Sequence, residues 1–331
     1  MRVAEVTEYG PPEVVGIAER PDPRPGVGEL RVRVHAACVG AADSAARSGS
    51  PWFARLAFGL RAPRRSVLGS DFAGVVDEVG PGVTRFTVGD RLFGATGAAV
   101  GAHGERLVVA ESAAIAALPA DVSMTDAAAA CDGALTALPF LRDGAHLRAG
   151  QRVLVIGASG SVGAAAVQLA KHLGAHVTAV CGPAHVDLVA SLGADRVVDH
   201  SVEDALAGPD TYDVVFDAVA ASTFRRARRV LRPGGTYLTT VPSFAILLQQ
   251  LTSRLGQRRA VIMFTGLRKD ADKAPDLERL AGLLAAGALR PPIEREVSLE
   301  QLAEGYRLVD SGHKGGSVVL RLVPADAEAR A

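Results

Sequence analysis

The feature that most restricts the fold of this chain is an apolar strand that runs into a turn of small residues. Residues 153–156 are Val, Leu, Val and Ile, and an amphipathic segment at 162–173 overlaps the end of the turn. Ala158, Gly160 and Gly163 take the three small-residue positions of the dinucleotide-binding fingerprint. The first permits a tight turn, the second lets backbone approach a pyrophosphate, and the third lets the helix pack against the strand. The pattern predicts a βαβ unit that holds the phosphates of a dinucleotide.

The context of the turn supports this prediction. A second strand is expected at 176–180, and the helix after the turn directs its N-terminal amides toward the phosphates. The alternative is a glycine-rich turn in a βαβ unit that binds no nucleotide. Residues expected to contact the cofactor here are Ala158, Ser159, Gly160, Ser161, Val162, Gly163, Cys181, Gly182, His185 and His200, with Val219 and Val241 at the ends of two later strands.

The end of the second strand bears on the choice between NAD and NADP. An acidic side chain there would bond the ribose 2′-hydroxyl and repel a 2′-phosphate. The chain has Cys181, Gly182, Pro183 and Ala184 at this point and no acid before Asp187. The absence favours NADPH. An Arg or Lys clamp is also missing, so His185 and His200 are the only nearby groups that could carry a positive charge; both could equally be ordinary surface histidines.

Periodicity divides the chain into two regions. Up to about residue 118, short apolar runs alternate with Gly and Pro turns, and strands are expected at 30–39, 73–79, 91–93 and 105–110. In the first of these, Val32 and Val34 share one face, and Arg31, Arg33 and His35 share the other. The later region alternates strands with helices, which predicts an α/β fold with a doubly wound parallel sheet. Its expected strands are 153–156, 176–180, 196–198, 213–219, 235–241, 260–265 and 317–322, and its expected helices are 162–173, 186–192, 223–231 (ended by Pro233) and 276–286.

Composition excludes several classes of protein. The 331 residues carry 36 basic and 36 acidic side chains, and no block of like charge predicts a nucleic-acid or anionic-membrane partner. Three cysteines without a CxxC pair argue against a disulfide framework and a structural zinc. No secretory leader and no apolar run long enough to span a bilayer is evident. These counts predict a soluble cytoplasmic protein.

Blocks spread along nearly the whole chain resemble one family. They are residues 68–76 (LGSDFAGVV), 82–90 (GVTRFTVGD), 133–137 (GALTA), the turn at 157–163, 192–195 (LGAD), 231–235 (LRPGG) and 311–316 (SGHKGG). In this order they resemble the medium-chain dehydrogenase/reductase superfamily, in its zinc-free quinone-oxidoreductase-like branch. The resemblance implies a Rossmann domain at 119–257 and a GroES-like β-barrel domain at 1–118, completed by 258–331.

Departures from the zinc-dependent members bear on the chemistry. Those enzymes place a Cys ligand where this chain has Gly40, and a His-Glu pair where it has Ser70 and Asp71. We therefore expect no metal. Without a Lewis acid, oxidation of a simple alcohol is difficult, whereas an activated C=C bond or a quinone accepts hydride more readily. The resemblance thus implies NADPH-dependent reduction of a quinone, enone or related polyketide-like compound. The alternatives are a zinc-free NADP-dependent alcohol or carbonyl dehydrogenase, and a catalytically silent NADPH-binding protein.

The resemblance also implies roles for single residues. Thr136 and Phe264 correspond to positions beside the nicotinamide, and the strand before Phe264 corresponds to one that pairs in a homodimer. Trp52 and Phe53 fall in a loop that lines the substrate cleft. Asp43 and Asp71, near the vacated metal position, are weak candidates for a proton relay. Each residue also has a purely structural alternative. Thr136 could be an ordinary threonine inside a helix, the two aromatic rings could simply be packed, and the two acids could bond only local backbone amides.

Overall fold

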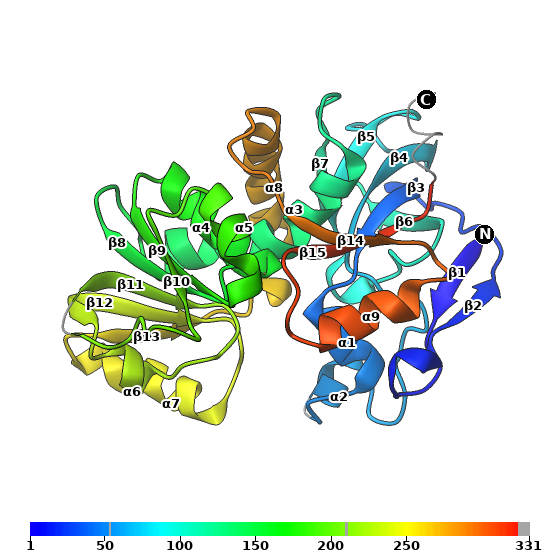
Figure 1. The fold of residues 1–331 in the computed structure, drawn as a ribbon. Helices are drawn as coiled ribbons and strands as arrows, with labels where there is room; N and C mark the ends of the chain where they lie inside the picture. The colour runs from blue at the N-terminus through cyan, green and yellow to red at the C-terminus, as the bar shows by residue number, and fades with distance from the viewer. Residues whose placement is uncertain (53, 209–210, 324–331) are drawn as a thin grey trace. The chain divides into compact units, whose positions relative to one another are not determined.

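The chain forms two compact units, which the computed structural model describes over residues 1–52, 54–208 and 211–323 (Figure 1). Unit 1 comprises Met1–Asp132, Leu267–Gly287 and Ile293–Ala331, and unit 2 comprises Gly133–Gly266 and Ala288–Pro292. The division falls inside helix α3 (Met124–Pro139). Phe53, one of the expected substrate residues, lies outside the described residues.

Unit 1 is built on a mainly antiparallel sheet in the order β14-β15-β3-β4-β5-β7, with β6 also paired to β3. The strands are β3 (Glu29–Cys38), β4 (Asp71–Val79), β5 (Arg91–Ala95), β6 (Arg106–Ala110), β7 (Ala114–Ala117), β14 (Ile293–Val297) and β15 (Ser317–Arg321), and β1 (Arg2–Glu5) pairs with β2 (Gly16–Glu19). All four strands expected before residue 118 are present. The last strands of the chain join the first ones, because β15 pairs with β3.

Burial along β3 explains one departure from the expected alternation. Val32 and Val34 are buried and Arg33 is exposed, as the two-residue period predicts, but His35 is only 2% exposed. From Val34 to the end of the strand every residue is buried. Here β15 pairs along the edge of β3, and the Cys38 thiol donates a hydrogen bond to the carbonyl of Ala128 in α3.

The helices of unit 1 are short apart from α3 and α8. They are α1 (Ala41–Ser48), α2 (Ala54–Phe58), α8 (Asp270–Ala285) and α9 (Leu302–Asp310). Tyr306 of α9 is fully buried in the core with Phe72 and Leu92 of the sheet. The guanidinium of Arg47 in α1 lies 5.1 Å from the centre of the Tyr306 ring and 2.7 Å from the Asp310 carboxylate, which fixes α1 against α9.

Unit 2 contains a six-stranded, entirely parallel sheet in the order β10-β9-β8-β11-β12-β13. Its strands are β8 (Arg152–Ile156), β9 (His176–Cys181), β10 (Arg196–Asp199), β11 (Tyr212–Asp217), β12 (Leu231–Thr239) and β13 (Arg259–Ile262), and its helices are α4 (Ser161–His172), α5 (Val186–Ser191), α6 (Phe224–Ala227) and α7 (Phe244–Thr252). Numbered within the unit, this order is 3-2-1-4-5-6, that of a doubly wound Rossmann sheet. Figure 1 shows α4 and α5 on one face of the sheet and α6 and α7 on the other.

Three expectations for unit 2 need correction. The helix expected at 223–231 is only α6, because Val230 and Leu231 are buried and Leu231 already begins β12. Pro233 is tolerated inside β12 because the pairing with β11 shifts register there, so its missing N–H leaves no gap in the ladder. The strand expected at 260–265 ends at Ile262.

The unit boundaries also differ from the expected domains. Strand β13 pairs with β12, and residues 258–266, expected in the GroES-like domain, group with unit 2. Residues 119–132, expected in the Rossmann domain, group with unit 1.

Candidate functional site

The turn after β8 leaves open space in front of a helix N-terminus. Gly160 is the N-cap residue of α4 and has an extended backbone. If a Cβ atom were added to Gly160, its only neighbour within 4 Å would be the carbonyl oxygen of Gly157, at 3.7 Å. A Cβ atom on Gly163 would lie 2.1 Å from the same oxygen. Gly163 therefore permits the close packing of α4 on β8, whereas Gly160 leaves its backbone accessible. These features fit the phosphates of a dinucleotide.

Two other segments approach the same turn. A Cβ atom on Gly157, whose φ is +76°, would lie 2.7 Å from the side chain of Val219. A Cβ atom on Gly133 of α3 would lie 2.4 Å from the carbonyl oxygen of Ser161, and Thr136 follows one helical turn later. The fold thus brings two of the expected cofactor residues, Val219 and Thr136, toward residues 157–161.

The loop that carries Val219 is fixed by a buried acid that the sequence analysis missed. Asp217, fully buried at the end of β11, accepts hydrogen bonds from the amides of Val219, Ala221 and Ser222 at 2.8–3.3 Å and from the Tyr237 hydroxyl at 3.0 Å. Burial and the neighbouring Asp217 raise the pKa of Tyr237 far above its ordinary value. Tyr237 is therefore a structural hydrogen-bond donor.

The acid-free end of β9 faces a histidine. The Nε2 atom of His200 lies 3.5 Å from the place of a Cβ atom on Gly182, and the His200 amide donates to the carbonyl of Cys181 at 3.1 Å. An acid does stand nearby, because Asp199 pairs in register with Cys181. Its carboxylate accepts hydrogen bonds from the amide and hydroxyl of Ser201 at 2.8 and 2.7 Å. Cys181, Gly182 and His200 thus lie together, as the cofactor prediction requires.

The remaining cofactor candidates have weaker support. His185 is half-buried at the start of α5, and the side chains of Val241 and Phe264 are 44% and 50% exposed. No contact in the described part of unit 2 ties Val241 or Phe264 to the turn, so their roles rest on the resemblance.

Unit 1 contains a group of polar side chains around Gly40. A Cβ atom on Gly40 would lie 2.9 Å from Oδ1 of Asp132, a residue that the sequence analysis did not single out. The other carboxylate oxygen of Asp132 is buried, has no hydrogen-bond partner among the described residues, and lies 4.0 Å from Nζ of Lys314. The signal that could have found Asp132 is an acid inside the apolar run from 127 to 141. We call Asp71, Asp132 and Lys314 the acid cluster.

Asp71 belongs to this cluster as the first residue of β4. The register of β3 and β4 pairs Ala37 with Phe72, which places Asp71 beside Cys38. Its carboxylate accepts a hydrogen bond from the Ser70 hydroxyl at 3.1 Å. Burial, with the nearby carboxylates of Asp132 and Asp43, raises the pKa of Asp71 well above its ordinary value. A protonated carboxyl group at this position could donate a proton.

Asp43 has a structural role that its local bonds explain. Its side chain is 3% exposed and accepts the Gly40 amide at 2.9 Å, which caps the first turn of α1. Burial raises the pKa of Asp43. The interaction with His103 and the hydrogen bond from the Gly40 amide offset part of this increase. The His103 ring bonds the carbonyl of Cys38 at 2.8 Å and lies 3.4 Å from the Tyr306 hydroxyl. Of the two relay candidates, Asp71 is the one without such a local backbone role.

One observation bears on the substrate prediction and one on the metal prediction. Trp52 is 74% exposed, before α2. Within the described ranges, no three His, Cys, Asp or Glu side chains are arranged to hold a metal ion. No helix among them is long and apolar enough to cross a bilayer.

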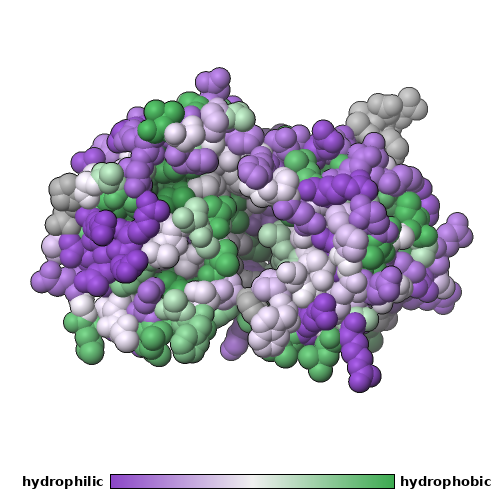
Figure 2. Space-filling view, turned by 60° about the horizontal axis from the view of Figure 1, so that its bottom comes forward, coloured by the Kyte–Doolittle hydropathy of each residue, from purple (hydrophilic) through white to green (hydrophobic). Residues whose placement is uncertain are grey.

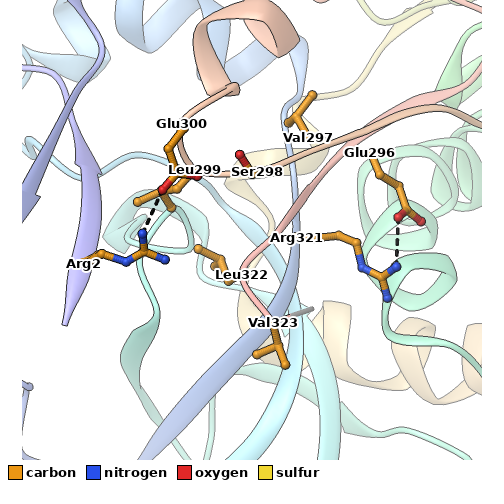
Figure 3. A pocket seen from close by; sticks show the side chains of 9 residues that line it. All are labelled: Arg2, Glu296, Val297, Ser298, Leu299, Glu300, Arg321, Leu322 and Val323. Atoms are coloured by element: carbon orange, nitrogen blue, oxygen red, sulfur yellow. Dashed lines mark hydrogen bonds and ion pairs between the residues drawn. The ribbon is translucent and has the colours of Figure 1, made fainter. Parts of the chain in front are cut away.

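A hollow of about 410 Å³ in unit 1 contains none of the expected site residues. Figure 3 shows its lining, in which Arg2 points to Glu300 and Arg321 points to Glu296. Both contacts are ion pairs, at 2.8 and 2.9 Å. The charged side chains that line this hollow thus form ion pairs with one another.

Comparison with known proteins agrees with this architecture. Residues 26–120 match the alcohol dehydrogenase GroES-like domain family, and residues 192–320 match the zinc-binding dehydrogenase family. The chain is 32% identical over 327 residues to the mitochondrial NAD(P)H oxidoreductase RTN4IP1 of Mus musculus, covering 89% of this chain and 82% of that protein. It is 31% identical to a quinone oxidoreductase of Pseudomonas aeruginosa, covering 94% and 97% of the two chains.

One solved structure and one much longer relative complete the comparison. The quinone oxidoreductase of Coxiella burnetii superposes with a TM-score of 0.87 at 26% identity, covering 98% of this chain and 99% of that one. The chain is also 35% identical over 306 residues to the spectinabilin polyketide synthase system protein NorB of Streptomyces orinoci; the match covers 90% of this chain but 13% of that protein. The predicted fold class, a Rossmann sheet with a GroES-like domain, is confirmed. This chain therefore belongs to the medium-chain dehydrogenase/reductase superfamily, in its quinone-oxidoreductase-like branch, and is an NAD(P)H-dependent oxidoreductase.

Proposed function

We propose that this protein uses NADPH to reduce a quinone, an enone or a related conjugated acceptor without the help of a metal ion. The observation that carries the proposal is the arrangement around Gly40. Oδ1 of Asp132 and Oδ2 of Asp43 lie 2.9 and 3.5 Å from the Cβ position of Gly40, Lys314 lies 4.0 Å from Asp132, and Gly40 itself has no side chain. Such a group can move a proton but offers no set of N or S ligands for zinc.

Unit 2 supports the choice of cofactor. The accessible backbone at Gly160 and the N-terminal amides of α4 would hold the pyrophosphate, and Gly182 with His200 would accept the 2′-phosphate. When bound, NADPH would supply the hydride. This chain's own contribution would be to hold and orient the dinucleotide and to protonate the product.

The acid cluster supports the second half of the reaction. Hydride addition to a conjugated acceptor leaves an enolate or hydroquinone anion, which takes up one proton. Asp71, whose pKa is raised by burial and by the neighbouring carboxylates, would give that proton and regain one from solvent; Asp132 and Lys314 would position it.

The test is a spectrophotometric assay of NADPH oxidation with quinones, enones, simple aldehydes and alcohols. We expect turnover with the first two classes and little with the others. Oxidation of simple alcohols that depends on added zinc would overturn the proposal. Tight NADPH binding without turnover of any acceptor would instead favour a silent binding protein.

We also propose that the protein forms a homodimer and is located in the cytoplasm. Strand β13 is the last in the sheet order, so its outer edge has no partner strand within the described part of unit 2. Pairing with a second copy would extend the sheet across that edge. Light scattering of the purified protein distinguishes a dimer from a monomer directly.

A further inference from the structure

Helix α8 carries a lysine on the face that it buries. This residue, Lys273, is only 3% exposed. It begins an apolar stripe at helical spacing that continues with Leu277, Leu280 and Leu284. Lysines almost never lie fully buried without a compensating charge, because water solvates the ammonium group better than a protein interior does. Figure 2 shows the ordinary arrangement, with hydrophilic residues spread over the visible surface of each unit. The burial of Lys273 therefore requires an explanation.

The place of Lys273 within α8 adds a second cost. Lys269 is the N-cap residue and Asp270 begins the helix, so Lys273 lies at the end of the first turn. The N-terminal end of a helix carries the positive pole of its dipole, which favours acidic residues and disfavours an ammonium group. Burial and the helix dipole thus both act against a positive charge here. The stability of α8 by itself does not account for this lysine.

The ammonium group of Lys273 extends toward the start of β4. Its Nζ atom lies 3.8 Å from the position that a Cβ atom would take on Gly97, two residues beyond the end of β5. The amide and hydroxyl of Thr96 donate to the carbonyl of Ser70 at 2.7 and 3.2 Å. Asp71, the next residue, pairs in register with the last residue of β5. Lys273 thus lies at the end of the β4–β5 pair that carries Asp71.

Two carboxylates act on Lys273. Burial lowers the pKa of Lys273, whereas the negative charges of Asp270 and Asp71 raise it. Asp270 is an exposed residue of the same helix, so water weakens its effect. Arg268 adds a positive charge that lowers the pKa of Lys273, although this arginine is itself paired with Asp276 at 2.7 Å. Strand β7, against which α8 packs, has no titratable side chain. Of the two carboxylates, Asp71 is the less exposed.

The influence of Lys273 on Asp71 has the opposite sign. Burial and the carboxylates of Asp132 and Asp43 raise the pKa of Asp71, and the charge of Lys273 opposes that increase. The other lysine of this region, Lys314, lies 4.0 Å from Asp132. Three uncharged polar groups also lie near Asp71: the Ser70 hydroxyl and the thiols of Cys38 and Cys131, whose pKa values burial raises. Lys273 is thus a buried cation that acts on the acid of the proposed reaction.

We propose that Lys273 is a positioning residue for proton transfer, and that its ammonium group stabilises the carboxylate that Asp71 becomes after it gives its proton to the reduced acceptor. Water screens a fixed charge in a buried site only weakly, so such a charge can stabilise another that develops during the reaction. The ammonium group would do so without moving, at the point where Asp71 begins β4. This inference rests on the proposed function, in which Asp71 is the acid.

The proton transfer balances without a further reactant. The O–H bond of Asp71 breaks, and its proton bonds to the anion that hydride addition leaves on the acceptor. The electron pair of that bond stays on the Asp71 carboxylate, which Lys273 and the Ser70 hydroxyl stabilise until water returns a proton. Lys273 keeps its own protons throughout. Without the ammonium group, the carboxylate would form beside Asp132 and Asp43 without this compensation, and Asp71 would be a weaker acid.

The first experiment compares two substitutions of Lys273 by the pH profile of kcat for NADPH oxidation. Lys273→Met keeps the length of the side chain and removes its charge, whereas Lys273→Arg keeps the charge. In the Met variant we expect the loss of kcat at alkaline pH to begin about one pH unit higher, because the pKa of Asp71 rises. The plateau below that pH should fall by about three- to tenfold, because a weaker acid donates its proton more slowly. Lys273→Arg should keep the alkaline limb of the unmodified protein.

Lys269→Met is the matched control. Lys269 is an exposed lysine one helical turn before Lys273, so its loss removes a similar charge from the same helix without changing the surroundings of Asp71. The plateau and the pH profile of this control should match those of the unmodified protein. A purely structural role of Lys273 would lower kcat or stability in Lys273→Met at every pH and would leave the alkaline limb in place.

A second experiment detects the coupling of the two charges without turnover. Thermal unfolding is followed against pH for the unmodified protein, Asp71→Asn, Lys273→Met and the double variant. Asp71 destabilises the folded protein as pH rises from the ordinary pKa of an aspartate to its raised one. Because loss of Lys273 raises that upper limit further, the gap between Lys273→Met and the double variant should widen to about one pH unit higher than the other gap. Circular dichroism checks folding, and Lys273→Gln replaces Lys273→Met if the latter unfolds.

The outcomes separate this inference from the proposed function. An alkaline limb that moves upward in Lys273→Met, together with the wider thermal gap, supports the inference. If the unmodified protein turns over acceptors and Asp71→Asn removes the alkaline limb, but Lys273→Met shifts neither the limb nor the thermal gap, only the inference is wrong. If no acceptor is turned over, or Asp71→Asn keeps the unmodified kcat and pH profile, the proposed function fails and the inference fails with it.

Discussion

The Nε2 atom of His200 lies 3.5 Å from the position that a Cβ atom would take on Gly182. These residues come from the ends of two adjacent parallel strands, β9 and β10. A strand end that lacks an acid thus has an imidazole ring beside it, and the proposed 2′-phosphate site depends on this pair.

Gly182→Asp should shift preference from NADPH toward NADH. A carboxylate here would repel the 2′-phosphate and would also pair with His200, so we expect the ratio of kcat/KM values to change by about 10–100-fold. The measurement is kcat/KM for both cofactors on the unmodified protein and the variant. A preference for NADH already present in the unmodified protein would contradict the cofactor proposal.

Gly160→Val and Gly163→Ala should fail in different ways. Gly160 has open space around its Cβ position, so the valine variant should fold normally and lose nucleotide affinity. Gly163 has a backbone oxygen 2.1 Å from that position, so even alanine should lower the melting temperature. Calorimetric titration and thermal unfolding separate the two effects. Unchanged NADPH affinity in folded Gly160→Val would show that the pyrophosphate lies elsewhere.

Asp71→Asn should lower kcat and flatten its pH profile. The folded protein holds the Asp71 proton more tightly than an unfolded chain does, because its pKa is raised. An acid that must be protonated loses activity as pH rises through that raised pKa, so the unmodified protein should lose kcat on the alkaline side. General acid catalysis is worth about 10²–10⁴-fold, and water can replace part of it, so we expect a loss of about 100-fold. A variant with the unmodified protein's kcat and pH profile excludes Asp71 as the acid.

The same pKa shift predicts an effect on stability with a definite sign. Where the folded state binds a proton that the unfolded state has released, stability falls as pH rises. This window extends from the ordinary pKa of an aspartate upward to the raised pKa of Asp71. Asp71→Asn removes the effect, so the variant's melting temperature should exceed that of the unmodified protein by about 2–4 °C at alkaline pH, and by less at acidic pH. A constant difference at all pH values would assign the effect to packing.

Asp43→Ala should act on stability through the start of α1. It removes the acceptor of the Gly40 amide, and loss of a helix cap costs about 1 kcal/mol. Denaturant unfolding should show this loss, while the pH dependence of kcat for the folded fraction stays as in the unmodified protein. A changed pH profile with unaltered stability would reverse the assigned roles of Asp43 and Asp71.

Chelation should leave activity unchanged. Gly40 offers no side chain and no three suitable ligands converge within the described ranges. Elemental analysis of the purified protein should therefore find no stoichiometric zinc, and dialysis against a chelator should not alter kcat. Stoichiometric zinc, lost together with activity, would reverse the preference for conjugated acceptors over alcohols.

Local sequence was sufficient for the nucleotide-binding half of this protein. The strand at 153–156, the turn at 157–163 and the helix after it appear as β8, the turn and α4, because the constraints on them act between residues close in the chain. The same applies to the strands of unit 1, whose two-residue alternation reflects burial of one face. His35 breaks that pattern: it is buried next to the stretch of β3, residues 36–38, that pairs with β15 from the far end of the chain.

Only the tertiary structure could reveal Asp132 and the orientation of α7. Asp132 and Gly40 are 92 positions apart in the sequence, and the 2.9 Å between Oδ1 of Asp132 and the Cβ position of Gly40 depends on where α3 lies beside the end of β3. Helix α7 was not among the helices expected from the sequence, and a leucine-rich helix ordinarily packs its leucines inward. Bonds from Gln250 and Ser253 to the amides of β13 instead turn the leucines toward solvent. Residue patterns report which side chains share a face, but long-range pairing decides which face is buried.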